Sequence, residues 1–289
     1  MLPLGSALAF HRGLQAEVLG NHSDLDPDLH AMFSDYYGVL RDRVGLYPFY
    51  CYNWTRRVTP MLEIIAGLPM RSEPWRILDA GCGMGTESIF WSTLRTDVAI
   101  MGVDIHSERL DVARVRQRAY ERQLERSLGL CFARQDIFQV LQARRFDLVW
   151  SMESISHIDP AEGFLESVAE ALDSPGRLVI SDSHLGNPMM AWRVWRLRTS
   201  GVAERTSKMV RQQGLSYAQE RLFTVNKLSR LLRSAGFRTV QTQLVVYFPP
   251  ALARFSSLFK VCMWFDALLS RIPLIRSLGG IYTIVASKS

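Results

Sequence analysis

Glu153 and His157 carry the side chains best suited to moving a proton, and they lie four residues apart in the segment WSMESISHID, residues 150–159. One helical turn would point both into the same cavity. Imidazole titrates near neutrality and is a natural base for a hydroxyl group, and a carboxylate is a second proton acceptor. Each residue has a structural alternative, because His157 can hydrogen-bond nearby backbone and Glu153 can orient polar groups of a ligand. His184, which follows a later apolar run, is a third candidate.

A glycine-rich turn lies upstream, in the sequence RILDAGCGMGTE over residues 76–87. An apolar run leads into three glycines at alternating positions, Gly81, Gly83 and Gly85, and a helical pattern follows. Glycine permits a sharp turn and lets a ligand lie against bare backbone. The next apolar run ends at Asp104, whose carboxylate suits ribose hydroxyls. This combination predicts a nucleoside site at the carboxyl ends of parallel strands.

The spacing within the turn separates two classes of nucleoside ligand. Dinucleotide loops follow G-x-G-x-x-G, because the pyrophosphate needs a close helix amino terminus. Here the spacing is G-x-G-x-G, and Thr86 occupies the third position of the dinucleotide pattern. Asp79 precedes the turn, and its charge would repel a pyrophosphate but attract an ammonium or sulfonium group. The turn therefore favours S-adenosylmethionine over NAD.

The elements that must hold these residues alternate between strands and helices from residue 75 onward. Strands are predicted at 76–80, 99–104, 128–134, 146–151, 177–182, 237–247 and 281–287, and helices at 86–94, 107–126, 160–172 and 225–235. Continuous apolar strands separated by helices are typical of a parallel sheet buried on both faces, so we expect an α/β protein. Residues 1–74 are predicted to form a helical extension or cap before a domain spanning 75–289. Helical insertions at 186–216 and 249–280 are expected to form a lid over the site.

These motifs resemble those of the class I S-adenosylmethionine-dependent methyltransferases. The resemblance covers about residues 75–183 and the final strand. It is carried by the 79–85 turn, VDI at 103–105, RQDI at 134–137 and FDLVWS at 146–151. It implies a Rossmann-like sheet of seven mostly parallel strands with helices on both faces. In that fold the last strand runs antiparallel between the fifth and the sixth.

The same resemblance implies cofactor contacts position by position. Gly81, Cys82 and Gly83 would contact the methionine part and the ribose, Asp79 would lie near the amino group and sulfonium, and Asp104 would bind the ribose diol. The remaining implied contacts are Gly85 in the turn, Ile105 after the second strand, Asp136 and Ile137 beside the adenine, and Ser151 and Met152 at the end of the fourth strand. Asp136 can also be interpreted as an ordinary turn residue.

The 150–159 segment is similar to its counterpart in tocopherol- and sterol-type C-methyltransferases, and the Asn/Asp-Pro-Pro-Tyr signature of nucleic-acid base methylation is missing from it. The expected function is methyl transfer to a small or lipid-like acceptor, by C- or O-methylation. With a prenyl-like acceptor, Glu153 would accept a proton after methylation of the alkene. Two alternatives stay open: methylation of RNA or protein, and binding of S-adenosylmethionine without catalysis.

The net charge of +6 is concentrated in residues 185–260, which hold thirteen Lys and Arg residues against two acidic ones. An apolar helical stripe runs from Leu252 to Ile272. Together these features predict an anionic acceptor or a peripheral contact with a membrane surface, with solvated helix faces as the alternative. Nucleic acid is the less favoured partner.

The four cysteines form no CxxC pair, which is typical of a reducing compartment, and a cytoplasmic location is expected. The sequence holds no uncharged apolar stretch long enough to span a membrane. The six histidines do not cluster, so no metal site is predicted. The oligomeric state is left open.

Overall fold

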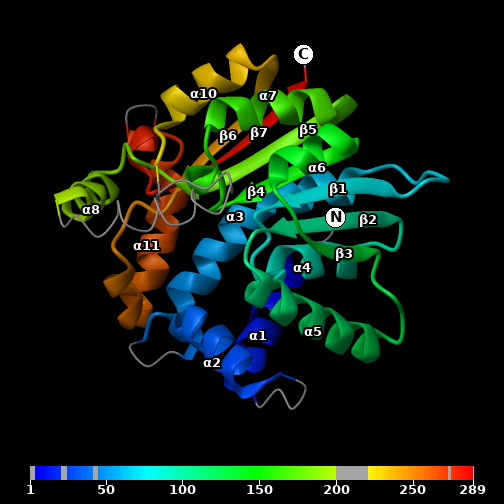
Figure 1. Cartoon of the computed structure of the whole chain (residues 1–289). Coiled ribbons are helices and arrows are strands. Elements are labelled where there is room, and N and C mark those ends of the chain that lie inside the picture. Colours follow the sequence, from blue (N-terminus) through cyan, green and yellow to red (C-terminus); the bar gives the residue numbers. More distant parts are fainter. Residues whose placement is uncertain (1–3, 21–24, 42–44, 200–220, 273–274, 289) are drawn as a thin grey trace.

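The computed structural model describes residues 4–20, 25–41, 45–199, 221–272 and 275–288. Its centre is a sheet of seven strands in the order β3-β2-β1-β4-β5-β7-β6 (Figure 1). The strands are β1 (Trp75–Ala80), β2 (Val98–Asp104), β3 (Leu130–Arg134), β4 (Phe146–Met152), β5 (Leu172–Ser183), β6 (Phe237–Val245) and β7 (Ile281–Lys288). Strands β1 to β5 pair in parallel, and β7 runs antiparallel to both β5 and β6. The predicted α/β fold with an inserted antiparallel last strand is confirmed.

Helices cover both faces of this sheet. One face carries α6 (Ile137–Ala143), α7 (Ala161–Ala171) and α10 (Val225–Ser234). The other side of the molecule holds α1 (Leu4–Leu19), α2 (Pro27–Tyr36), α3 (Tyr47–Gly67), α4 (Thr86–Leu94) and α5 (Ser107–Leu124), drawn below the sheet in Figure 1. Two further helices, α8 (Pro188–Thr199) and α11 (Ser256–Leu269), lie to one side of the strands in that view.

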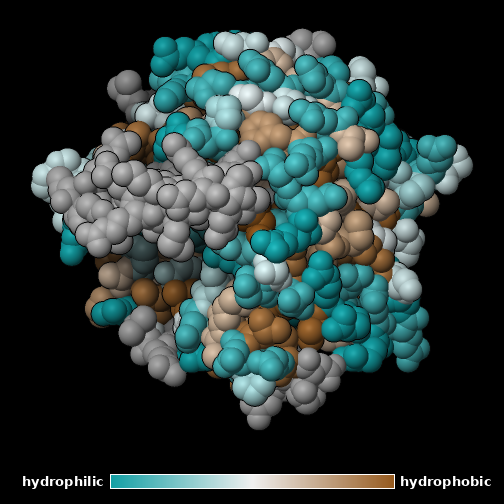
Figure 2. All heavy atoms as spheres, in the orientation of Figure 1, coloured by the Kyte–Doolittle hydropathy of each residue, from teal (hydrophilic) through white to brown (hydrophobic). Residues whose placement is uncertain are grey.

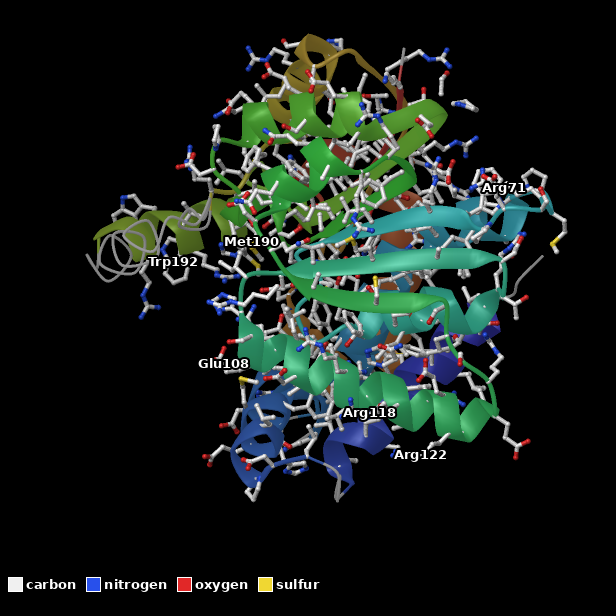
Figure 3. The ribbon with its side chains drawn as sticks, turned by 45° about the vertical axis from the view of Figure 1, so that its right-hand side comes forward. Arg71, Glu108, Arg118, Arg122, Met190 and Trp192 are labelled. Atoms are coloured by element: carbon white, nitrogen blue, oxygen red, sulfur yellow. The ribbon has the colours of Figure 1, made fainter. Side chains whose placement is uncertain are left out.

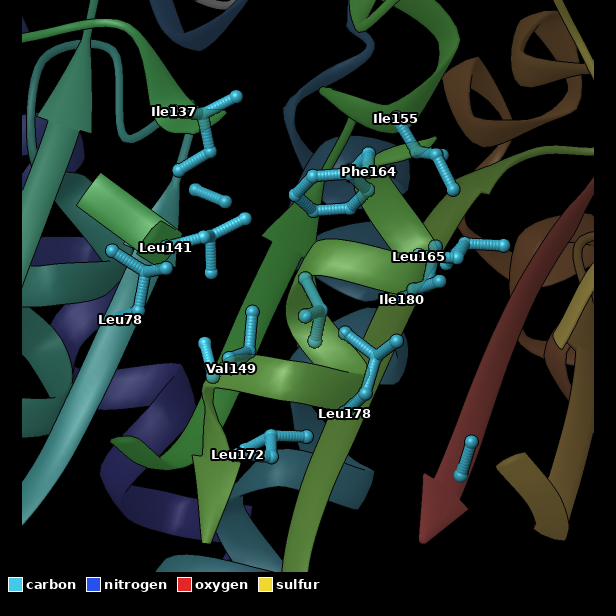
Figure 4. Packing of buried hydrophobic residues seen from close by; sticks show 14 of the residues in the cluster. Leu78, Ile137, Leu141, Val149, Ile155, Phe164, Leu165, Leu172, Leu178 and Ile180 are labelled. Atoms are coloured by element: carbon cyan, nitrogen blue, oxygen red, sulfur yellow. The ribbon is translucent and has the colours of Figure 1, made fainter. Parts of the chain in front are cut away.

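The buried positions of the strands explain why the sheet needs cover on both faces. Leu78, Val149 and Leu178 are register partners on β1, β4 and β5, and they pack against α6 and α7 (Figure 4). Their chain neighbours Ile77 and Leu148 point to the opposite face, because successive strand side chains alternate. The apolar runs seen in the sequence thus fill two cores at once.

Helix α3 belongs to the second of these cores. Val58, Met61 and Ile65 of α3 are fully buried in one cluster with Ile77 of β1 and Trp150 of β4. The amino-terminal helices therefore complete one face of the sheet, and α3 extends from that face to the carboxyl ends of the strands. This placement lets an amino-terminal segment contribute side chains to the site.

Two local predictions differ from the structure. Helix α6 was not expected, because a seven-residue helix gives too short a pattern to separate it from a loop. Strand β5 begins at Leu172, directly after α7, five residues earlier than predicted. Insertion 249–280 contains three helical segments: α11 and the short 3-10 turns η3 (Pro250–Arg254) and η4 (Ile275–Leu278). Of insertion 186–216, residues 200–216 lie outside the described residues.

Candidate active site

The sheet order reverses between β1 and β4, and a cavity of about 350 Å³ opens at the carboxyl ends of these strands. Open parallel sheets bind ligands at such a reversal, because the connections leave the two strand ends in opposite directions. The lining includes five of the predicted cofactor residues: Gly81, Asp104, Ile105, Asp136 and Ile137. The proton-accepting candidates Glu153 and His157 line it as well. We call this space the nucleoside cavity.

The glycine turn is held against the end of β4 by a tight contact. Gly81 has a φ of +78°, and a Cβ added to it would lie 2.5 Å from the Cβ of Ser154. Ser154 is itself fixed, because its Oγ donates to the carbonyl of Ala80 at 2.6 Å and lies 2.7 Å from the Oγ of Ser151. Only glycine therefore fits at position 81.

Asp104 connects the second strand to the turn. Its Oδ2 accepts the backbone N–H of Gly83 at 2.9 Å, and its Oδ1 accepts the N–H of His106, also at 2.9 Å. Each carboxylate oxygen can accept at least one more hydrogen bond. Because Asp104 also lines the cavity, its remaining acceptor capacity is available to a diol. This is the arrangement expected for ribose recognition.

Asp136 has a structural role that the sequence did not reveal. It is the N-cap of α6, and its Oδ1 accepts the N–H of Phe138 at 2.8 Å. The cap fixes the start of the helix, so that Ile137 and Gln135 are held in the cavity wall. The turn-residue interpretation of Asp136 is confirmed, and its contact with a ligand stays a prediction that its place in the cavity lining supports.

Asp79 lies beneath the turn and is not part of the cavity lining. Its carboxylate is buried and accepts a 2.6 Å hydrogen bond from the Oγ of Ser88 in α4. Burial raises the pKa of Asp79 to about 8, and the nearby carboxylate of Glu87 adds to the rise. The predicted contact with a sulfonium thus has no open path in this structure, and Asp79 instead joins β1 to α4.

The other predicted cofactor residues also lie outside the cavity lining. Cys82 and Ser151 are buried, Met152 packs against the core shared with α3, and Gly85 leaves no room for a Cβ beside Phe132. Gly83 is not in the lining either, but its surroundings are open and not packed. It has a φ of +53°, and an added Cβ would meet no atom within 4 Å. The turn therefore has two glycines packed against protein, at positions 81 and 85, and one facing open space at position 83.

Glu153 occupies a strained position at the end of β4. Its φ is +51°, in the left-handed region that non-glycine residues rarely adopt. An ion pair of 2.6 Å joins its Oε1 to Nη1 of Arg57 from α3. The Arg57 side chain is 5% exposed, whereas that of Glu153 is 53% exposed. A buried guanidinium is thus paired with a carboxylate that is open to solvent and to the cavity. Strain of this kind is common where a side chain must be aimed at a ligand.

Asp182, at the end of β5, is a buried carboxyl group in the same cavity wall. Burial raises its pKa to about 6, and the charge of Glu153 adds to the rise while Arg57 opposes it. It accepts the N–H of Ser183 at 2.7 Å and the N–H of Ser156 at 3.3 Å. Asp182 thereby holds the turn after β4 against the end of β5.

The two predicted histidines have different surroundings. His157 ends the 3-10 turn η2 (Ile155–His157) and lines the nucleoside cavity. Glu153 precedes that turn, so the expected single helix carrying both residues does not form. His184 lies outside the cavity: its buried Nδ1 is 3.0 Å from the carbonyl oxygen of Gly279, and burial lowers its pKa. We therefore assign His184 a structural role.

A second cavity of about 260 Å³ adjoins the first, and both include Glu153, Ser183 and Arg193 in their walls. We call it the acceptor cavity. Its walls come from α3, from α8 and from the segment after β6. They carry apolar and aromatic side chains, namely Phe49, Tyr50, Met189, Met190, Tyr247 and Phe248. In Figure 3, α8 extends away from the sheet, with Met190 nearer to the strands and Trp192 farther out.

Aromatic side chains near the acceptor cavity differ in whether they line it. Tyr247 lines the acceptor cavity, whereas Trp192 and Trp195 are mostly exposed on α8. Tyr217 lies outside the described residues. The cavity instead uses Tyr50 and Arg57 from α3, which the sequence analysis missed because nothing in the chain links α3 to the end of β4.

Comparison with known proteins agrees with the family resemblance of the sequence motifs. Residues 72–236, more than half of the chain, match the protein family described as "Methyltransferase domain". The chain belongs to this family. S-adenosylmethionine is accordingly the cofactor expected at the nucleoside cavity.

Individual relatives of this methyltransferase share about 30% of its residues or fewer over the matched segments. It is 27% identical over 187 residues to the methyltransferase GfsG of Streptomyces halstedii, covering 63% of each chain. It is 30% identical over 126 residues to the 27-O-demethylrifamycin SV methyltransferase of Amycolatopsis mediterranei, covering 43% of this chain and 44% of that one. The match thus spans less than two thirds of either relative. Magnesium protoporphyrin IX methyltransferase from Synechocystis, solved with bound S-adenosylhomocysteine, shares the fold with a TM-score of 0.51 and 16% identity. That match covers 96% of this chain and 94% of the other.

The residues of the nucleoside cavity fit such a cofactor. Asp104 keeps acceptor capacity for the ribose diol, and Gly81 lines the same cavity with bare backbone. Ile105 and Ile137 supply apolar side chains to the wall, and Asp136 supplies an acceptor for an exocyclic amine. The groups needed at both ends of a nucleoside are therefore present in one cavity.

The described residues hold neither a cluster of metal ligands nor a helix that could span a membrane. No group of three or more His, Cys, Asp or Glu side chains there is placed to hold a metal ion. None of the helices in the described part of the chain is long and apolar enough to cross a membrane.

Proposed function

We propose that this methyltransferase moves a methyl group from S-adenosylmethionine to a small, lipid-like acceptor by O- or C-methylation. The observation that carries the proposal is the shared boundary of two cavities. One has the donors and acceptors of a nucleoside site and the other is largely apolar, and Glu153, Ser183 and Arg193 border both. Methyl transfer requires donor and acceptor to meet in line, which two adjoining cavities permit.

The residues of this chain would divide the work as follows. Asp104, Gly81, Asp136 and Ile137 would hold the nucleoside, and the bound cofactor supplies an electrophilic methyl group. The apolar walls of the acceptor cavity would exclude water from the nucleophile. Alignment and water exclusion account for much of the rate when the leaving group is already good.

Arg57 supports an acceptor with a negative charge or an enolisable carbonyl group near the transfer site. Its guanidinium is buried in the acceptor cavity wall, with Nε donating to the Oδ1 of Asn53 at 3.0 Å and Nη1 paired with Glu153. Two N–H groups on one ion can bind both Glu153 and an acceptor oxygen. Glu153 and His157 remain the proposed proton acceptors for the substrate. Both line the nucleoside cavity, and Glu153 also lines the acceptor cavity.

The direct test is binding of S-adenosylhomocysteine to the full chain by calorimetry. We expect wild-type binding and its loss in Asp104→Ala, whose methyl group accepts no hydrogen bond. Absence of wild-type binding would refute the proposal. Untargeted comparison of metabolites with and without the protein then identifies pairs that differ by one CH2 unit. Binding without any such product would favour the non-catalytic alternative.

Two variants then separate the chemistries once the acceptor is known. Glu153→Gln should slow alkene methylation, and His157→Ala should slow hydroxyl methylation. Full turnover in both would leave positioning alone as the catalytic contribution of the protein.

We also propose that the protein acts in the cytoplasm at the surface of a membrane. The four cysteines are all free thiols, in keeping with a reducing compartment. The acceptor cavity lies beside helices with exposed apolar side chains, which suits an acceptor drawn from a lipid phase.

The structure gives less support to methylation of RNA or protein. The described basic residues of the 185–260 region lie on α8, α10, β6, η3 and α11, apart from Arg221, which is paired with Asp159. Arg193 is the member of this described set that lines the nucleoside cavity. A steep salt dependence of RNA binding would overturn this ranking.

A further inference from the structure

Helix α11 and its flanks expose an unusual number of large apolar side chains. Between 36% and 63% of the surface of each of the following residues is exposed: Phe255, Leu258, Val261, Trp264, Phe265, Leu268 and Ile272. We call these seven residues the α11 outer face. In Figure 2, hydrophobic residues reach the surface in the region where Figure 1 draws α11.

The opposite side of α11 is buried in the protein. Phe259, Cys262 and Asp266 repeat at three- and four-residue steps and face inward. Leu258, Phe265 and the other outer-face residues repeat at similar steps on the far side. A surface helix of a protein that works in water alone carries polar residues there. Helix α11 is instead apolar on two sides, and among the residues that the structure describes only the inward side is buried.

The exposed charged side chains of residues 249–272 are all cationic. Arg254, Lys260 and Arg271 are exposed between residues 249 and 272. The acidic residue of this stretch, Asp266, is fully buried. Its carboxylate accepts the N–H groups of Val246 and Tyr247 and the hydroxyl of Tyr52. No acidic side chain from this stretch therefore reaches the outer face, so an apolar stripe bordered by cations is presented to any partner.

This surface is connected to the acceptor cavity. Phe248 and Pro250 line the cavity, and the ring of Phe248 packs against the ring of Phe259 at a centroid distance of 5.8 Å. The inward side of α11 thus supports the cavity wall while its outward side is open. A partner on the outer face would lie one helix away from the acceptor cavity.

We propose that the α11 outer face docks on an anionic lipid bilayer, with its apolar side chains at the boundary between headgroups and acyl chains. Apolar residues flanked by Lys and Arg, without exposed acids, match the chemistry of such a surface. Docking would place the acceptor cavity at the source of a lipid-like substrate. This inference rests on the proposed function for its purpose, but the contact itself can be tested separately.

The test is co-sedimentation of the full chain with vesicles of two compositions: phosphatidylcholine alone, and phosphatidylcholine with an equal amount of phosphatidylglycerol. We expect binding to the anionic vesicles that weakens as salt is added. Trp264→Ser with Phe265→Ser should lower the partition coefficient at least about tenfold, because each side chain gives up its transfer into the interface. The matched control, Leu19→Ser with Val240→Ser, alters two equally exposed apolar residues on α1 and β6 and should bind like wild type.

Charge reversal tests the second half of the proposal. Lys260→Glu with Arg271→Glu should abolish the preference for anionic vesicles, whereas Arg233→Glu with Arg238→Glu, on α10 and β6, should retain it. Every variant is checked for S-adenosylhomocysteine binding, so that loss of lipid binding with retained ligand binding separates this proposal from the proposed function.

Three results would overturn the inference. These are no binding of the wild type to anionic vesicles, equal binding by the α11 variant and its control, and a wild-type dimer in light scattering that Trp264→Ser with Phe265→Ser makes monomeric. The last result would show that the outer face joins two copies of this chain.

Discussion

Two glycines of the same turn should respond differently to the addition of one methyl group, Gly81 mainly in stability and Gly83 mainly in ligand binding. Both Gly81 and Gly83 have a positive φ, so alanine at either position is conformationally strained by about 1 kcal/mol. At position 81 the new Cβ would also lie 2.5 Å from the Cβ of Ser154, which must move. At position 83 the new Cβ would meet no protein atom within 4 Å.

The displacement at Gly81 carries a further energetic cost. Ser154 makes two hydrogen bonds, to the Ala80 carbonyl and to Ser151, and each contributes about 1 kcal/mol. Together with the strain, Gly81→Ala should lower the free energy of unfolding by about 3 kcal/mol. In a chain of this size that corresponds to a fall in Tm of about 5 °C. Gly83→Ala should lower Tm by only about 2 °C, from strain alone.

Ligand binding should distinguish the two variants further. Thermal unfolding and calorimetry with S-adenosylhomocysteine are measured on both proteins at the same pH. Gly83→Ala should bind the ligand at least about tenfold more weakly, because its methyl group fills space assigned to the cofactor. A Gly81→Ala protein as stable as wild type would refute the packing argument. Wild-type affinity in Gly83→Ala would show that the open side of Gly83 does not face the ligand.

Three other substitutions test individual assignments. Asp79→Asn should raise Tm more at pH 8 than at pH 5. The pKa of Asp79 in the folded protein lies above its value in the unfolded chain, so the wild type loses stability as pH rises towards 8. The uncharged amide of the variant removes that loss. A difference in Tm that does not change with pH would contradict the raised pKa of Asp79. His184→Ala should cost about 3 kcal/mol, because it leaves a cavity and an unpaired Gly279 carbonyl, and calorimetry should find ligand affinity unchanged. Arg57→Met should change the unfolding free energy by less than about 1 kcal/mol, since half-exposed Glu153 remains hydrated, yet turnover of the identified acceptor should fall; a large drop in Tm would show a mainly structural ion pair.

Five of the eleven residues that the sequence predicted for the nucleoside half of the site line one cavity, because their signals are local. A strand, a glycine turn and a helix follow one another directly, and the next strand ends at Asp104. In a parallel sheet the carboxyl ends of neighbouring strands lie together, so placing Gly81 and Asp104 in order along the chain also placed them in space. The structure puts both in one cavity wall.

The acceptor half could not be predicted in this way. Arg57 meets Glu153 only because α3 packs on one face of the sheet and extends to the carboxyl ends of its strands. Asp182 becomes a wall residue with a raised pKa because β5 and the turn after β4 close around it. A single residue such as Arg57 or Asp182 carries no pattern of its own in the sequence, and its role depends on which elements are neighbours.

The sequence by itself determined the family, the segments that form strands and the nucleoside fingerprint, since alternating elements and glycine spacing act over short distances. Tertiary structure decided which of the predicted residues can touch a ligand. It buried Asp79 under the turn and His184 against Gly279, and it brought Arg57 to Glu153. The physical reason is that burial and charge pairing depend on packing between distant segments, and packing is settled only when the whole sheet and its helices come together.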